Sequence, residues 1–176
     1  MAVLTAATVV IVGVEQAIIL AIVLSIIEHL AHAYRPYDTT LAVDGKGGLA
    51  ISRVSSGTVI QAAPGLVVYR FGAGLYYANA TRFMEEILAI VDDADPKIEW
   101  FCLSGAAMGD VDYSGAEAIS QVVTQLKERG VTFVLCDVEP EVASIPAKYG
   151  FAPEVAAVYP FLQDVIKAYQ QRGASA

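Results

Sequence analysis

The amino-acid sequence predicts an α/β fold, in which helices pack on a β-sheet. Short apolar runs typical of buried strands occupy residues 66–71, 98–103 and 131–138. Between them, residues 80–91 and 114–129 carry apolar side chains at the three- and four-residue spacing of amphipathic helices. Strands that alternate with helices in this way form a sheet with helices on its faces. We therefore expect a mixed sheet with helices packed on it.

The composition excludes several classes of protein. The chain has 176 residues, with 11 lysines and arginines against 19 aspartates and glutamates, and a formal net charge of −8. A nucleic-acid-binding surface needs clustered basic residues, so we expect no nucleic-acid partner. Hydrophobic residues make up 56% of the chain, which argues against disorder. The hydrophobic residues are concentrated near the N-terminus, and the rest of the chain is long enough for one ordinary globular domain.

Residues 2–27 form a long apolar stretch in which Glu15 is the only ionisable side chain. A bilayer core of about 30 Å needs about 20 apolar helical residues, so this stretch is long enough to enter a membrane. A secretory signal peptide is less favoured because residues 1–10 carry no lysine or arginine. A buried helix of a globular domain would have few polar side chains to face water. We favour a membrane segment interrupted near residues 13–16 and followed by a short helix at 17–33.

The stretch after this apolar segment is expected to be a linker. Pro36 ends the helix, because proline lacks the backbone N–H that a helix requires. The glycine-rich sequence up to residue 48 is typical of a connecting segment. Short strands are then expected at 49–54, 58–61 and 75–78. Two further helices are expected near the C-terminus, at residues 141–148 and 159–171.

The residues with reactive side chains do not form a catalytic or metal-binding pattern. Cys102 and Cys136 both lie in strand-like runs, which favours reduced thiols in the core. His29 and His32 have no cysteine or acidic residue at ligand spacing. No Ser-His-Asp arrangement or paired carboxylates in a predicted cleft can be assembled. We therefore expect no metal, no cofactor and no enzymatic activity.

The candidate functional site is a loop that joins the end of a strand to the start of a helix. Its residues are Asp110, Asp112, Tyr113, Ser114 and Gly115. Free N–H groups at a helix N-terminus favour anions. Asp112 or Ser114 can act as the N-terminal cap of the helix, which by itself would account for the motif. The alternative is a regulatory surface that contacts an anion, a nucleotide or a protein partner.

Three motifs occur in an order typical of one protein family. Residues 64–71 and 74–80 carry the first motif, residues 110–118 the second, and residues 13–18 the third. The first two resemble the opening and the loop-to-helix signature of a STAS domain, and the third resembles the last membrane segments of the SulP family. The chain is thus similar to the C-terminal part of a SulP-family, sulfate permease-like anion transporter.

The resemblance implies an organisation and a function. Residues 1–33 would be the C-terminal end of a transmembrane domain, residues 34–48 a linker, and residues 49–176 a cytoplasmic STAS domain with regulatory and assembly roles. The whole protein would be a secondary transporter of sulfate, bicarbonate or dicarboxylates in the cell (inner) membrane. Its STAS domain would work with the upstream transport domain. A homodimer, a separate protein partner and a nucleotide remain open as further partners.

Two other functions remain open. One is a stand-alone STAS interaction module like the anti-sigma-factor antagonists, in which the residue after the matching aspartate is a phosphorylatable serine. This sequence has Tyr113 at that position and so departs from their pattern. The other is a small nucleotide-binding domain, for which residues 72–74 (Gly-Ala-Gly) offer only a weak signal because a lone GxG is not specific.

Overall fold

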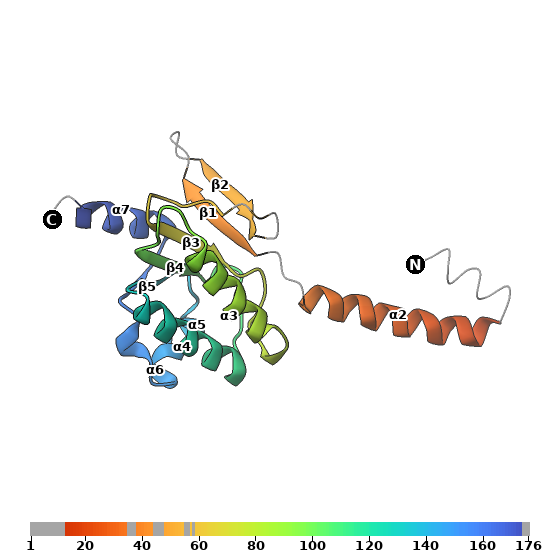
Figure 1. The fold of residues 1–176 in the computed structure, drawn as a ribbon. Helices are drawn as coiled ribbons and strands as arrows, with labels where there is room; N and C mark the ends of the chain where they lie inside the picture. The colour runs from red at the N-terminus through yellow and green to blue at the C-terminus, as the bar shows by residue number, and fades with distance from the viewer. Residues whose placement is uncertain (1–12, 35–37, 44–47, 55–56, 58, 174–176) are drawn as a thin grey trace. The chain divides into compact units, whose positions relative to one another are not determined.

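The chain divides into two compact units, Met1–Pro36 and Tyr37–Ala176. A computed structural model describes residues 13–34, 38–43, 48–54, 57 and 59–173 (Figure 1). The first unit contains helix α2 (Val14–Tyr34), which starts directly after Gly13. Gly13 has a φ of 122°, in the region that favours glycine, and the helix begins at the next residue.

The second unit is built on a six-stranded sheet with the order β2-β1-β3-β4-β5-β6 (Figure 1). The strands are β1 (Thr39–Val43), β2 (Leu49–Arg53), β3 (Leu66–Arg70), β4 (Trp100–Ser104), β5 (Thr132–Cys136) and β6 (Ala157–Tyr159). Strands β3 to β6 are parallel to one another, whereas β1 is antiparallel to both β2 and β3. The predicted α/β class with a mixed sheet is confirmed.

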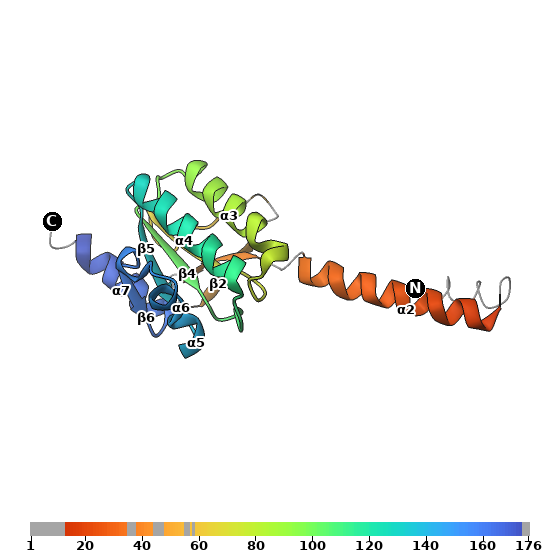
Figure 2. The same ribbon diagram turned by 90° about the horizontal axis from the view of Figure 1, so that it is seen from below.

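Helices cover both faces of this sheet. They are α3 (Tyr77–Asp92), α4 (Tyr113–Glu128), α5 (Pro140–Ala143), α6 (Ile145–Lys148), the 3₁₀ helix η2 (Ala152–Glu154) and α7 (Leu162–Gly173). Helices α3 and α4 lie side by side on one face, and α7 lies on the other (Figure 2). Successive strand residues point to opposite faces, so Val67 and Tyr69 join the core under α3 and α4, and Leu66 and Val68 join the core under α7.

Strand β1 lies within the segment that we expected to be a linker. Its residues pair with β2 on one side and with β3 on the other, and Leu41 is fully buried. A five-residue strand with two threonines gives little hydrophobic signal on its own, so only the two partner strands identify it. Strand β6 was likewise not expected, and it consists of three residues paired with β5.

Two expected strands are not formed. Residues 59–61 have no strand structure, and residue 58 lies outside the described residues. At 75–78, only Leu75 makes an isolated bridge, to Val111, and helix α3 begins at Tyr77. The helix starts here because Asn79 accepts a hydrogen bond from the N–H of Tyr76 (2.8 Å), which closes the first turn. The expected helix at 141–148 is divided into α5 and α6.

The buried cysteines match the expectation of core thiols. Cys102 on β4 and Cys136 on β5 are both free and fully buried in the core under α7. Their sulfur atoms are 3.3 Å apart. Burial raises the pKa of the Cys102 thiol well above its usual value, which keeps the group protonated.

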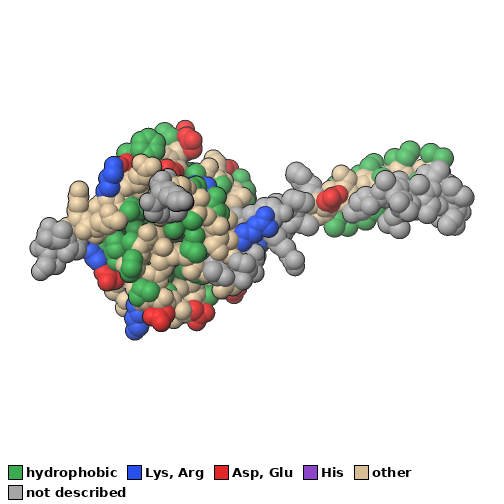
Figure 3. Space-filling view, turned by 90° about the horizontal axis from the view of Figure 1, so that it is seen from above, with side chains coloured by type: hydrophobic (Ala, Val, Ile, Leu, Met, Phe, Trp, Pro, Cys, Tyr) green, Lys and Arg blue, Asp and Glu red, His purple; other side chains and the backbone are tan. Residues whose placement is uncertain are grey.

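Helix α2 exposes apolar side chains between Val14 and Ile27 (Figure 3). The exposed aliphatic residues are Val14, Ile18, Ile19, Ile22, Val23, Ile26 and Ile27. Among the described residues, no helix is both long enough and apolar enough to cross a bilayer. The expected first part of the membrane segment, before Gly13, lies outside the described residues.

Candidate functional site

The predicted loop at residues 110–115 lies beside the loop that precedes helix α3. Contacts between the two loops connect the starts of helices α3 and α4. Leu75 and Val111 form a parallel bridge between these loops. The N–H of Leu75 donates to the carbonyl of Asp110, and the N–H of Asp112 donates to the carbonyl of Leu75, each at 3.0 Å. The N-termini of two helices that are far apart in the sequence are therefore held next to each other.

Asp112 is the N-terminal cap of α4 and also serves α3. Its Oδ1 accepts a hydrogen bond from the N–H of Gly115 at 2.7 Å, in the first turn of α4. Its Oδ2 accepts from the N–H of Tyr77 at 3.0 Å, the first residue of α3. One carboxylate thus satisfies backbone donors at both helix ends and places its negative charge at the positive ends of both helix dipoles.

Gly115 allows helix α4 to approach the second loop. It is buried, and a Cβ atom at this position would lie 2.4 Å from the carbonyl oxygen of Leu75. Only glycine fits there without moving the backbone. Ser114, the other predicted cap, is partly exposed, and the capping bond belongs to Asp112.

Exposed tyrosines flank the shared carboxylate. The exposed fractions are 69% for Tyr113, 81% for Tyr77 and 40% for Tyr76. The ring of Tyr113 meets the ring of Tyr149 edge to face, with centroids 5.8 Å apart. Large aromatic side chains that remain exposed beside rigid helix ends are typical of surfaces that contact other proteins. We call Tyr76, Tyr77 and Tyr113 the tyrosine patch.

The charges around the loop do not favour an anion. A cleft of about 230 Å³ beside it is lined by Asp110 and Glu141 as well as by Lys148. The carboxylate of Asp110 accepts from the N–H of Val111 at 2.8 Å. Because Asp112 already binds the N–H groups of both helix ends, a phosphate placed here would meet carboxylates rather than free donors.

The Gly-Ala-Gly segment at residues 72–74 has a structural use. The N–H of Gly72 donates to the carboxylate of Asp38 at 3.0 Å, and the carbonyl of Gly74 accepts from the side chain of Asn79 at 3.0 Å. These two hydrogen bonds hold the backbone that leads into helix α3.

A buried polar cluster links the start of the second unit to helix α3, and the sequence analysis did not find it. The side chain of Asp38 is only 1% exposed and pairs with Arg82 at 2.7 Å. Arg82 also contacts Glu86 at 3.4 Å, and Glu86 accepts from the hydroxyl of Tyr69 at 3.3 Å. Asp38 and Arg82 are 44 residues apart, so no local pattern in the sequence could pair them.

Burial determines the protonation of this cluster. It raises the pKa of the Asp38 carboxyl to about 7, and the nearby carboxylate of Glu86 adds to the rise, while the N–H of Gly72 and the guanidinium of Arg82 oppose it. Burial also raises the pKa of Tyr69 well above its usual value. Among the described residues, no group of three or more histidine, cysteine or acidic side chains could hold a metal ion.

Comparison with known proteins identifies the fold and the family. Residues 58–173 match the STAS domain family model. A probable sulfate transporter of Mycobacterium tuberculosis strain H37Rv is 34% identical over 142 residues, which cover 80% of this chain and 25% of that protein. The chain thus spans about a quarter of the length of the curated relatives it matches.

Solved structures share the fold. The murine Slc26a9 anion transporter in its inward-facing state has a TM-score of 0.74 and 16% identity, covering 96% of this chain and 28% of that one. The unphosphorylated anti-sigma-factor antagonist SpoIIAA has a TM-score of 0.54 and 13% identity, covering 65% of this chain and 96% of that one. The likeness to SpoIIAA is one of fold alone.

The mixed sheet with α3 and α4 on one face and α7 on the other, together with the family match, identifies a domain of the STAS class. The chain belongs to the STAS domain family, and it is similar in sequence to probable sulfate transporters.

Proposed function

We propose that this chain is the C-terminal regulatory and assembly part of a SulP-type secondary anion transporter, of the sulfate, bicarbonate or dicarboxylate class. The observation that carries the proposal is the 34% identity to a probable sulfate transporter over 142 residues. This alignment is longer than the STAS match at residues 58–173, so it includes residues outside that match. The role is not enzymatic.

The proposed organisation places residues 1–33 at the end of the transmembrane domain and residues 49–176 in a cytoplasmic STAS domain, attached to the cell (inner) membrane. Residues 34–48 join them, and within this segment β1 is already part of the sheet. The exposed aliphatic side chains of helix α2 support this arrangement, because apolar surface of this extent is stable only when lipid or protein covers it.

The tyrosine patch is the proposed contact surface for a protein partner of the STAS domain. It combines exposed aromatic rings with a backbone that Asp112 fixes at both helix starts. A rigid surface of this kind loses little conformational entropy on binding. Titration calorimetry with GTP or ATP tests the alternative that this loop binds a nucleotide, and the surrounding carboxylates lead us to expect no heat.

Alkaline carbonate extraction tests the membrane attachment. The whole chain is compared with a chain that begins at Tyr34 and keeps all of the second unit. We expect only the whole chain to remain in the membrane pellet, while the shorter chain is soluble and folded. If both chains are soluble and monomeric, α2 is not a membrane element and the stand-alone STAS module becomes the better account.

A further inference from the structure

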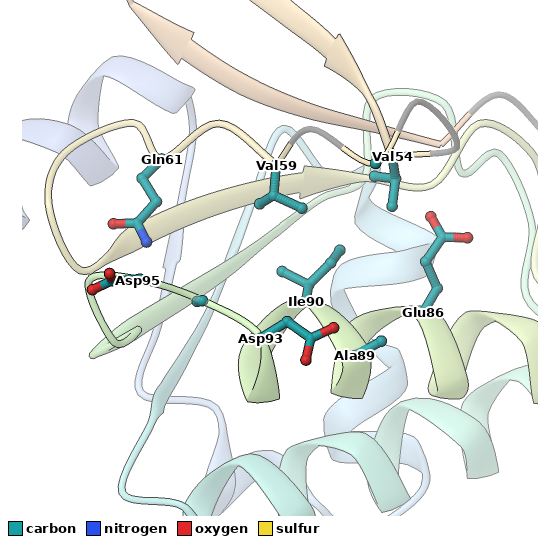
Figure 4. A pocket seen from close by; sticks show the side chains of 10 residues that line it. Val54, Val59, Gln61, Glu86, Ala89, Ile90, Asp93 and Asp95 are labelled. Atoms are coloured by element: carbon teal, nitrogen blue, oxygen red, sulfur yellow. The ribbon is translucent and has the colours of Figure 1, made fainter.

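A cleft of about 500 Å³ lies between the segment that follows β2 and the C-terminal half of helix α3 (Figure 4). It is separate from the 110–115 loop, which contacts the opposite end of α3. Val54, Val59 and Ile90 form apolar walls, and Ile90 is only 4% exposed. A volume of this size is in the range of clefts that accept several side chains or a small ligand.

The polar groups of the cleft are all acidic or neutral. Glu86, Asp93 and Asp95 line it, and neither lysine nor arginine does so among the described residues. In Figure 4 the carboxylate of Glu86 points toward Val54, whereas the carboxylate of Asp93 lies over the helix below Ile90. Because Glu86 pairs with Arg82 at 3.4 Å, the negative charge beside this apolar surface comes from Asp93 and Asp95.

Two of these carboxylates stand where they destabilise their own helix. Asp93 is the C-terminal cap of α3, Asp95 follows it, and the last turn of the helix has no basic residue. Carboxylates at a helix C-terminus interact unfavourably with the helix dipole. The neighbouring Asp92 is compensated by Arg129 at 2.9 Å, but within the described part of the chain neither Asp93 nor Asp95 makes an ion pair. A cation from outside the domain would supply this missing compensation.

We propose that this cleft binds a lysine- or arginine-bearing cytoplasmic loop of the transporter's own membrane domain. An aliphatic side chain of the loop packs on Val59 and Ile90, and its cation lies beside the carboxylate of Asp93. The basic character of the loop follows from charge complementarity with the acidic cleft. Its assignment to the membrane domain follows from the excess of lysine and arginine in the cytoplasmic loops of membrane proteins. This inference rests on the proposed function, which assigns a membrane domain to the part of the relatives' length that this chain does not span.

The test measures binding of a labelled synthetic peptide to the whole chain in a neutral maltoside detergent. The peptide has about ten residues, with two arginines flanking one leucine among glycines and serines, and detergent alone provides the background. A second peptide carries glutamate in place of arginine. We expect the basic peptide to bind, the acidic peptide not to bind, and the affinity to fall as salt is added.

Two sets of variants locate the binding. Asp93→Asn together with Asp95→Asn is expected to weaken binding about tenfold or more. Ala89→Arg, on the exposed rim of the cleft, is expected to abolish it by filling the cleft with a cation. The matched control, Glu117→Gln together with Glu128→Gln, removes the same charge from exposed positions on α4 and is expected to keep the affinity within about twofold.

The outcomes separate this inference from the proposed function. If the control variant loses as much peptide affinity as the cleft variants, the peptide is attracted to the acidic surface in general and the inference is overturned. Equal binding of the basic and the acidic peptide would also overturn it. If the cleft variants behave as expected but carbonate removes the chain from membranes, the proposed membrane attachment fails while the basic peptide still defines the ligand class of the cleft. The assignment of that ligand to the transporter's own membrane domain would then be overturned.

Discussion

Asp112 shows how one side chain can organise a site. It was predicted as a helix cap because aspartate before a helical run accepts hydrogen bonds from free backbone N–H groups. The structure adds a second use, the bond to the N–H of Tyr77 at the start of α3. That bond joins residues 35 positions apart, so the local pattern around residue 112 carries no information about it.

Replacing Asp112 should therefore cost more stability than the loss of an ordinary cap. We expect Asp112→Ala to lower the free energy of unfolding by about 2 kcal/mol or more, since one cap contributes about 1 kcal/mol and two helix ends lose their acceptor. Urea unfolding followed by circular dichroism measures the change. Ser114→Ala is the control and should change it by less than about 0.5 kcal/mol. Equal effects of the two substitutions would show that Asp112 is not the cap of both helices.

Asp38 should make stability depend on pH. Its pKa is raised to about 7 by burial, whereas in the unfolded chain it returns to the usual value near 3.8. The folded state therefore holds a proton that the unfolded state has lost between these two values, so the free energy of unfolding falls as pH rises from about 4 to 7 and is then constant.

The variant Asp38→Asn should remove this contribution, because an amide does not ionise. We expect wild type to lose roughly 1 to 3 kcal/mol more than the variant between pH 5 and pH 8. Urea unfolding at both values tests this, with Glu139→Gln, an exposed site, as the control for charge removal. If wild type and Asp38→Asn follow the same pH profile, the Asp38 carboxyl is ionised throughout this range.

At the scale of elements, the position of α4 depends on the absence of a side chain at Gly115. The helix begins where its first turn touches the carbonyl of Leu75, and this contact holds the two loops of the candidate site together. A glycine near a helix start is usually unfavourable for the helix, so its presence here reflects packing rather than helix propensity.

The substitution Gly115→Ala should separate these elements. A Cβ at 2.4 Å from the Leu75 oxygen forces a backbone shift, and we expect a loss of about 1 to 3 kcal/mol in the free energy of unfolding. Gly109→Ala is a matched control in the preceding loop, because a Cβ there meets nothing within 4 Å. Thermal unfolding compares the two. A loss at Gly109 as large as that at Gly115 would contradict the packing argument.

At the scale of the whole molecule, the exposed aliphatic residues of helix α2 should control the behaviour of the chain in solution. We expect the whole chain to need detergent or to form oligomers, because apolar surface of this extent associates in water. The chain that begins at Tyr34 should be monodisperse without detergent. Size-exclusion chromatography with light scattering measures both. A monodisperse monomer of the whole chain without detergent would show that the second unit or the residues before α2 cover this helix.

Much of the second unit could be predicted from sequence, because its strongest elements are also its most periodic. Strands β3, β4 and β5 are continuous apolar runs buried on both faces, and α3 and α4 carry regular apolar stripes. The predictions of the weaker elements were wrong because these segments are short and lack a regular apolar pattern. Strand β1 lies in a segment that was predicted to be a linker. The segment at 75–78 was predicted to be a strand, but Asn79 and Asp112 accept hydrogen bonds from its N–H groups and helix α3 starts there.

The sequence by itself determined the α/β class, the family resemblance, a helix cap at Asp112 or Ser114 and the burial of the two cysteines, because each of these depends on local periodicity, local hydrogen bonding or a motif. Only the tertiary structure decided that Asp112 serves two helices, that Asp38 is buried against Arg82, and that an acidic cleft lies beside Asp93. Those features join residues that are far apart in the chain, and contacts of that kind are set by how the sheet and helices pack rather than by any neighbouring residue.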